Sequence, residues 1–201
     1  MTSDTLKIPT SRGRPRKFDE DAVLDTLTDL FWDKGYEATS MADILTATGL
    51  NKSSLYNSFG SKKDLFRRIL DRYVAQRMEG FADMAEANNQ PGLEALHAFL
   101  DAVFEFGRAG CLAVNTTTEL GTTDPVVSTL ARTYRDRIRE ALQKVLTVAT
   151  SASSPSEALI RTRTEMLLGF LLGYAVAART GAETSEMDGL AHAAHATIDA
   201  W

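Results

Sequence analysis

Short helical segments, each bounded by a capping residue and a glycine, follow one another in the first third of this chain. The segment SMADILTATG begins with Ser40, has Asp43 three residues later as in a capping box, and ends at Gly49. Asn51 and Gly60 bound KSSLYNSF in the same way. Because the capping residues and the glycines are so close together, the sequence predicts two short helices joined by a tight turn. No other feature of the sequence restricts the fold as much.

Helical spacing of apolar residues continues through the rest of the sequence, and strand-like alternation persists nowhere. A first helix is expected after Phe18, and a fourth opens with the capping box of Ser61 and Asp64 and continues to about Met84. Five more helices are expected between residue 93 and the C-terminus. We therefore predict an all-α protein of about nine helices.

Charge is unevenly distributed along the 201 residues, whose formal net charge is −5. Residues 1–17 carry five basic side chains against one acidic side chain, and residues 50–72 carry six against two, so each segment has a net charge of +4. The overall acidity argues against a nucleic-acid-binding protein, whereas local basic patches of this kind steer a protein toward phosphates.

Several broad classes of protein are excluded by composition. The longest apolar run, residues 166–178, is shorter than the roughly 20 residues that a membrane span needs. The single cysteine, Cys111, leaves no internal disulfide possible, and the N-terminus lacks the apolar stretch of a secretory signal. We expect a cytoplasmic protein with no membrane partner and with the substantial core that 44% hydrophobic residues allow.

The helix expected over KSSLYNSF divides into an apolar edge and a polar face. At 100° per residue, Leu55 and Phe59 share the edge that packs inward, which leaves Ser53 and Asn57 opposite and Tyr56 beside them. Ser and Asn offer donors and acceptors to base edges, and the second helix of a helix-turn-helix enters the major groove. The alternative is that these are ordinary surface polar residues of a small helical bundle.

The stretch FWDKGYEATSMADILTATGLNKSSLYNSFGSKKDLF resembles the TetR-type transcriptional regulators, over about residues 17–77. The positions that match the family pattern at its spacing are Gly35, Thr39, Ile44, Gly49, Leu55, Tyr56, Phe59, Lys62 and Leu65. The resemblance implies a DNA-binding domain over residues 17–77 with its helix-turn-helix at 40–59, and an effector-binding and dimerisation domain over residues 85–201. The loop composition of AEANNQPG, residues 85–92, favours a boundary there.

DNA contacts follow from the resemblance as expectations. The implied residues lie at the start of the second helix, on the third helix and at the start of the fourth: Thr39, Ser40, Lys52, Ser53, Ser54, Tyr56, Asn57 and Lys62. Ser58 departs from the pattern, since many members have His there. The segment GRPRKF resembles the basic lead-in of many members, so residues 1–16 are expected to form a flexible basic arm. Arg14 and Arg16 would then reach phosphates or the minor groove, or only raise affinity nonspecifically.

The second domain is expected to pair two subunits. The helix ending at Arg179 is apolar nearly all round, and Gly169, Gly173 and Ala177 recur every four residues, which permits close approach of backbones. A central core helix of a monomer is the alternative. His192 and His195 are candidates for the dimer interface, and no metal site or cofactor is expected.

An effector pocket is implied between the helices of the second domain. Its candidate lining residues are Phe99, Val103, Phe104, Cys111, Asn115, Glu119, Tyr134, Phe170 and Tyr174. GCLAVNTTTEL resembles a branch of the family in which some members sense electrophiles or oxidants with the cysteine at this place, although a lone Cys is most often a buried small hydrophobe.

The function predicted from the sequence is a homodimeric repressor that a small-molecule effector releases from a palindromic operator in double-stranded DNA. The alternatives are a regulator triggered by modification of Cys111, and an activator or architectural DNA-binding protein without a ligand. An enzyme is a distant alternative because no catalytic constellation is recognisable.

Overall fold

The computed structural model describes residues 18–201, which form nine α-helices, one short 3₁₀ helix and no strand. The helices are α1 (Glu20–Lys34), α2 (Met41–Thr48), α3 (Lys52–Phe59), α4 (Lys62–Ala87), α5 (Leu93–Gly107), α6 (Leu112–Leu120), α7 (Pro125–Ala149), α8 (Glu157–Arg179) and α9 (Thr184–Asp199), and the 3₁₀ helix is η1 (Ser151–Ser153). The predicted all-α fold is confirmed for this range. The expected basic arm, with Arg14 and Arg16, lies outside the described residues.

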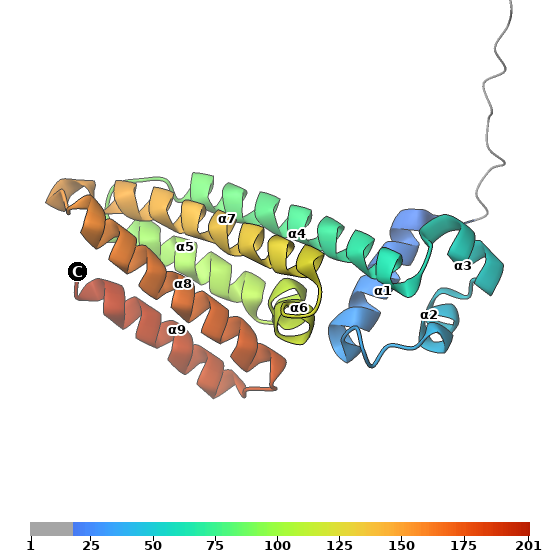
Figure 1. Ribbon diagram of the computed structural model, residues 1–201. Coiled ribbons are helices and arrows are strands. Elements are labelled where there is room, and N and C mark those ends of the chain that lie inside the picture. The colour runs from blue at the N-terminus through green and yellow to red at the C-terminus, as the bar shows by residue number, and fades with distance from the viewer. Residues whose placement is uncertain (1–17) are drawn as a thin grey trace, which may run out of the picture.

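The molecule has a small helical headpiece at one end and a larger helical body (Figure 1). We define the headpiece as residues 18–61 with the first two turns of α4, and the body as the remainder of α4 with α5 to α9. Helix α4 is shared, since it leads from the headpiece along the body beside α7 (Figure 1). It runs three residues beyond the expected end near Met84, so the two parts are joined through a continuous helix.

Local capping explains where the headpiece helices begin. Both capping boxes predicted from the sequence are formed, with Ser40 and Asp43 at α2 and with Ser61 and Asp64 at α4. Asn51 caps α3, where its Oδ1 accepts a hydrogen bond from the Ser54 backbone N–H at 2.8 Å. These caps satisfy amide groups that would otherwise lack partners, and each stabilises its helix by about 1 kcal/mol.

Two expected helix ends differ in the C-terminal half of the body. In the segment SSPSE, residues 153–157, a serine, a proline and a glutamate have the spacing of a helix start with its cap at Ser154. The N-cap of α8 is instead Ser156, whose side chain accepts from the Leu159 N–H. Ser154 instead ends η1 with a positive φ of 47°, which lies outside the geometry of a helix N-cap. The last helix ends at Asp199 rather than at Trp201.

A continuous apolar core runs through both parts of the molecule. In the headpiece, the rings of Phe31 and Phe66 meet edge to face, with centroids 4.8 Å apart, and so join α1 to α4. In the body, α7 packs against α4, α5, α6 and α8, and α9 covers α5 and α8. Helix α6 lies at the end of the body that faces the headpiece (Figure 1), so its side chains are placed to contact both parts.

Candidate nucleic-acid interface and effector cavity

Helix α3 is held to the headpiece by two buried side chains, Leu55 and Phe59, as its wheel predicted. The residues on its other side are exposed: Lys52, Ser53, Tyr56 and Asn57. Ser54 is half-buried at the margin of this face. We call these five residues the α3 face. It contains no acidic residue, so it combines one cation with hydrogen-bonding groups.

Tyr56 and Lys52 are neighbours on the α3 face. The Tyr56 side chain is 41% exposed, which is high for an aromatic residue, and the Lys52 Nζ lies 5.8 Å from the centroid of its ring. Ser53 Oγ donates to Asn51 Oδ1 at 2.8 Å. Asn57 makes no side-chain hydrogen bond within residues 18–201, so its amide is available to a ligand.

Thr39 does not belong with the exposed candidates. It is fully buried, and its hydroxyl donates to the Gly35 carbonyl at 2.6 Å. Its side chain therefore anchors the α1–α2 loop, and the expectation that it contacts DNA is wrong for this conformation. A buried Thr and an exposed Thr look alike in a sequence, because only packing distinguishes them.

Ser40 is exposed at the start of α2, but its hydroxyl is engaged in the cap. Its Oγ lies 2.7 Å from Asp43 Oδ2 and accepts from the Asp43 N–H at 3.1 Å. Asp43 also accepts from the Lys34 ammonium at 2.8 Å. That bond, followed by those from Ser40, holds the pKa of Asp43 well below its usual range. The start of α2 is thus held by a hydrogen-bonded cap in which Asp43 is charged at neutral pH.

Lys62 occupies the first turn of α4 and lies against the headpiece. Its Nζ is 4.3 Å from the centroid of the Tyr36 ring, a cation–π contact that places the charge beside the α1–α2 loop. Because the residue is only half-buried, its ammonium still borders solvent at the same end of the molecule as α3.

A small cavity of about 40 Å³ lies inside the body, between α4, α5, α6, α7 and α8. Four of the predicted pocket residues line it, namely Val103, Cys111, Tyr134 and Tyr174. Phe99 and Phe104 are buried in the core and Phe170 is half-buried, and none of these three borders the cavity. Aromatic residues at helical spacing fill the core far more often than they line a pocket, so a role for these three residues in effector binding stays a prediction to which this cavity lends no support.

Glu119 joins α6 to the headpiece instead of pointing into the cavity. Its carboxylate accepts the backbone N–H groups of Tyr36 at 3.0 Å and Glu37 at 2.7 Å. Gly35 permits this approach, because its φ is +80° and a Cβ there would lie 3.1 Å from a Glu119 oxygen. The expectation that Glu119 anchors an effector in the cavity is therefore wrong.

Asn115 lies one turn before Glu119. Both residues border a shallow hollow between the headpiece and α6, which is separate from the cavity. The buried Nδ2 of Asn115 has no hydrogen-bond partner in the part of the chain that the structure describes. A role for Asn115 as a polar anchor for an effector stays a prediction. The effector would then bind in the hollow between the headpiece and α6 and not in the cavity.

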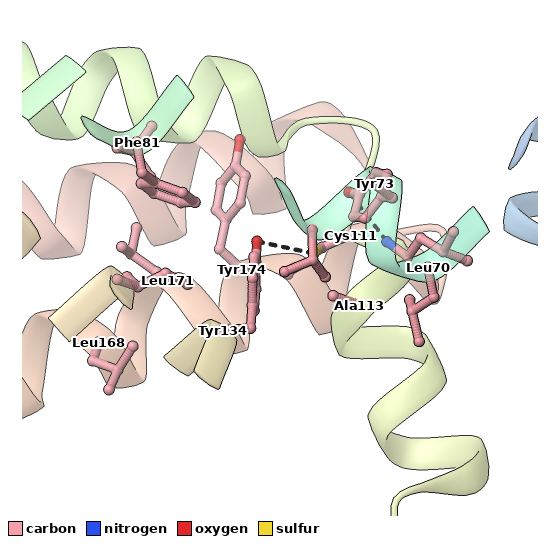
Figure 2. Packing of buried hydrophobic residues seen from close by; sticks show 14 of the residues in the cluster. Leu70, Tyr73, Phe81, Cys111, Ala113, Tyr134, Leu168, Leu171 and Tyr174 are labelled. Carbon is pink, nitrogen blue, oxygen red and sulfur yellow. Dashed lines mark hydrogen bonds between the residues drawn. The ribbon is translucent and has the colours of Figure 1, made fainter. Parts of the chain in front are cut away.

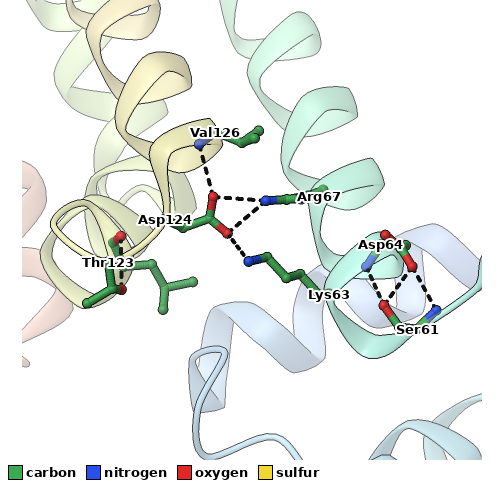
Figure 3. A network of polar contacts seen from close by, with 8 residues as sticks. Ser61, Lys63, Asp64, Arg67, Thr123, Asp124 and Val126 are labelled. Carbon is green, nitrogen blue, oxygen red and sulfur yellow. Dashed lines mark hydrogen bonds and ion pairs between the residues drawn. The ribbon is translucent and has the colours of Figure 1, made fainter.

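Asp124 forms a second link between the two parts, which the sequence did not reveal beyond marking the start of α7. Its carboxylate accepts from Arg67 Nη2 at 3.0 Å, from the Lys63 ammonium at 2.8 Å and from the Val126 N–H at 2.9 Å (Figure 3). The hydrogen bond from Lys63, with further ones from Arg67 and Val126, holds the pKa of Asp124 well below its usual range. Two residues of the basic segment 50–72 therefore act within the protein.

Arg77 is a cavity residue that sequence reasoning missed. It lies in the apolar stripe of α4, four residues after Tyr73 and four before Phe81, and it is only 8% exposed. A charged residue at a core position of an amphipathic helix was the available signal. Its three hydrogen bonds within residues 18–201 all go to uncharged oxygens, those of Tyr73, Phe106 and Gly110.

The candidates for the dimer interface fall into two groups. Gly169, Gly173 and His192 are exposed and Ala177 is half-buried, so the outer faces of α8 and α9 are accessible. His195 instead contacts His97 of α5, with the two Nδ1 atoms 2.6 Å apart and the rings stacked at 4.9 Å. The ring of His195 joins α9 to α5, and its side chain is still partly exposed, so its expected place at the dimer interface stays a prediction.

Metal-binding clusters and membrane-spanning helices are both absent from residues 18–201. No group of three or more His, Cys, Asp or Glu side chains is arranged there to hold a metal ion. No helix in the same range is long and apolar enough to cross a membrane.

Comparison with known proteins identifies the family. A profile described as "Bacterial regulatory proteins, tetR family" matches residues 23–69. The HTH-type transcriptional repressor ComR of Escherichia coli (strain K12) is 32% identical over 192 residues, which cover 92% of this chain and 91% of ComR.

Solved structures share the fold. The crystal structure of a TetR transcriptional regulator from Chloroflexus aurantiacus J-10-FL matches with a TM-score of 0.76 at 23% identity, over 89% of this chain and 93% of that one. A cysteine mutant of the TetR family transcriptional regulator CifR, complexed with 26-bp double-strand operator DNA, matches with a TM-score of 0.69 at 25% identity, over 90% of this chain and 98% of that one. The chain belongs to the TetR family of bacterial regulatory proteins and is a helix-turn-helix transcriptional regulator.

Proposed function

We propose that this protein is a cytoplasmic repressor that binds a palindromic operator as a homodimer and leaves it when a small-molecule effector binds the body. The observation that carries the proposal is the α3 face, which presents hydrogen-bonding groups and one cation from a helix whose other side is buried. The relatives support it, since ComR is a repressor and the CifR mutant was solved with operator DNA. We propose no catalysed reaction.

Each subunit would place α3 in the major groove. Ser53, Asn57 and Tyr56 would meet base edges, a thymine methyl or phosphate, and Lys52 and Lys62 would contact phosphates. Ser54 would contribute at the margin of the face and Ser40 at the N-terminus of α2, where free amide groups favour an anion. Arg14 and Arg16 remain proposed contacts to the minor groove or to phosphates.

The dimer would form through α8 and α9. An exposed stripe runs along α8, with Leu159, Met166 and Val176 each at least 39% exposed and with Gly169 and Gly173 between them. This spacing follows one helical face, and burial of such a face against a second copy is favourable. The two copies of α3 would then lie about 34 Å apart, one turn of DNA.

Effector release would act through the two links between the body and the headpiece. Glu119 of α6 holds the α1–α2 loop, and Asp124 at the start of α7 holds α4. An effector that binds better when α6 and α7 are displaced would shift the population toward a headpiece spacing that does not fit the operator.

Covalent modification of Cys111 is a second candidate trigger for release from DNA. Cys111 is buried in the cavity wall at the N-terminus of α6, where its Sγ donates to the Tyr134 hydroxyl at 3.2 Å. Covalent modification there would enlarge the side chain and displace α6 as an effector would. The Cys111→Ser protein distinguishes the two, because it would lose the response to electrophiles and keep the response to a non-covalent effector.

Genomic footprinting with the full-length protein tests the central proposal. We expect a small set of palindromic sites with half-sites about one turn apart, and loss of these sites in a Ser53→Ala/Asn57→Ala protein that is still folded by circular dichroism. A Gln76→Ala protein, altered at an exposed position on α4 outside the α3 face, should keep them. Equal footprints from the wild type and both variants would show that the α3 face does not recognise the operator sequence.

A further inference from the structure

Arg77 carries a buried positive charge that no carboxylate of residues 18–201 balances. Its Nε donates to the Tyr73 hydroxyl at 2.7 Å, and its terminal nitrogens donate to the carbonyls of Phe106 at 2.8 Å and Gly110 at 3.3 Å. The ring of Phe106 lies 3.8 Å from the guanidinium carbon. Within residues 18–201 it forms no ion pair, although buried charges in proteins are normally paired.

The polar groups around this charge have more donors than acceptors. A guanidinium has five N–H groups, and three of them are used, which leaves one on each terminal nitrogen. The Tyr73 oxygen accepts from Arg77 and from the Leu112 N–H, and the Tyr134 oxygen accepts from Cys111 (Figure 2). Each tyrosine hydroxyl also lies beside the Cys111 Sγ, which is only a weak acceptor.

Both hydroxyls keep their hydrogens at neutral pH. Burial is the main reason that the pKa of Tyr73 and the pKa of Tyr134 are raised far above their ordinary value. Cys111 and the two tyrosines lie close together between α4, α6 and α7 (Figure 2). Arg77, Tyr73 and Tyr134 thus offer hydrogen-bond donors and one positive charge, and no negatively charged acceptor within residues 18–201 pairs with them.

Arg77 and Tyr134 border the cavity, whose other walls are apolar and include Phe81, Val103 and Leu171. Its 40 Å³ corresponds to about three water molecules, at roughly 10–15 Å³ for each. We propose that the cavity binds a small organic monoanion, a short-chain carboxylate, with the carboxylate on Arg77 and the alkyl part against the apolar wall. This deepens the proposed function, on which it rests, by naming the chemical class of the effector.

The site is joined directly to the headpiece. The Arg77 guanidinium lies 5.7 Å from the ring of Trp32 on α1, and Tyr73 meets Trp32 edge to face with centroids 5.3 Å apart. The Trp32 indole N–H in turn donates to the Ala109 carbonyl at 3.0 Å. An anion that pairs with Arg77 reduces the pull of its charge on the Trp32 ring, so binding in the cavity changes a contact that holds α1 to the body.

Fluorescence of Trp32 provides the test. The chain has two tryptophans, so a Trp201→Phe background leaves Trp32 as the single reporter. Acetate, propionate and butyrate are titrated at constant ionic strength, with acetamide, propionamide and butyramide as uncharged probes of nearly the same shape. We expect the carboxylates to change the Trp32 emission and to raise the melting temperature, and the amides to bind at least tenfold more weakly.

Variants of the full-length chain assign the effect to Arg77. Arg77→Met should weaken carboxylate binding at least tenfold, whereas Arg132→Met, at an exposed position on α7 away from the cavity, should bind as the wild type does. If Arg77→Met does not fold, a Tyr134→Phe protein is titrated with both series. Loss of the hydroxyl should weaken the carboxylates more than the amides, because a hydrogen bond to a charged acceptor is the stronger one.

Equal binding of carboxylates and amides, or unchanged carboxylate binding by a folded Arg77→Met protein, would overturn the inference and leave a ligand-released repressor with a different effector. Absence of binding by either series, together with Cys111-dependent release of DNA by an electrophile, would overturn it in favour of the covalent trigger. Carboxylate binding that depends on Arg77 but leaves operator affinity unchanged would support the binding site. It would also show that this ligand does not release the protein from DNA.

Discussion

Individual side chains on α3 have two separable tasks. Leu55 and Phe59 are buried and hold the helix, whereas the side chains of Ser53 and Asn57 are exposed. A substitution at the exposed positions should therefore change DNA binding without changing the free energy of unfolding, as expected of a side chain that contacts DNA bases.

Asn57→Ala should weaken operator binding by about 1–3 kcal/mol, since Asn can form two hydrogen bonds with one base edge. The free energy of unfolding should stay within about 0.5 kcal/mol of the wild type, because the side chain is exposed. Fluorescence anisotropy with a footprinted operator and urea unfolding measure the two quantities. Gln76→Ala is the matched control, and equal affinity of both variants would remove Asn57 from the interface.

Residue-scale expectations succeeded where both partners are close in the sequence. Ser40 with Asp43, and Ser61 with Asp64, are three residues apart, so helix geometry alone brings them together. Glu119 and Thr39 were misassigned for the opposite reason. The partners of Glu119 are more than eighty residues away, and the burial of Thr39 depends on how the α1–α2 loop packs.

At the scale of helices, one buried carboxylate adds a polar link to the packing of α4 against α7. Asp124 caps α7 and at the same time pairs with Lys63 and Arg67 of α4 (Figure 3). The same residue thus positions two long helices relative to each other, and its ionisation is linked to folding.

Acid should weaken this junction in a predictable direction. The pKa of Asp124 is depressed by Lys63 and Arg67, so its contribution is full above the unfolded value of about 3.9 and is lost as pH falls toward the folded pKa. Asp124→Asn should lower the free energy of unfolding at pH 7 by roughly 1–3 kcal/mol. The difference from the wild type should shrink below about pH 4.

Urea unfolding at pH 7, 5, 4 and 3 measures the linkage at Asp124. Asp83→Asn, at an exposed position on α4 with no hydrogen bond or ion pair in the described part of the chain, is the control and should follow the wild type at every pH. A constant difference between Asp124→Asn and the wild type across this range would show that the carboxylate charge does not hold the junction.

For the whole molecule, the exposed stripe of α8 should determine the oligomeric state. Gly169 and Gly173 have open space where a Cβ would lie: apart from their neighbouring residues and the backbone of α8 itself, no described atom comes within 4 Å. The monomer thus has room for side chains at both positions, and a dimer packed through this face would not.

Gly173→Glu should convert the dimer to a monomer of 22.0 kDa. The folded subunit should be at least as stable as the wild-type subunit, since Gly in a helix interior costs about 1 kcal/mol. Light scattering after size exclusion gives the mass, and operator affinity should fall with it because both half-sites are needed. Ala75→Glu, exposed on α4, should remain dimeric; a dimeric Gly173→Glu protein would place the interface elsewhere.

Local patterns in the sequence were sufficient for the helices, their caps and the two sides of α3, because each depends on residues within a few positions of one another. The same patterns, by resemblance, indicated the family. The position of Arg77 in the cavity wall, the contact of His195 with His97 and the two links through Glu119 and Asp124 required the tertiary structure. Each joins helices that are distant in the chain, and only the packing of the complete core determines which of their polar groups meet.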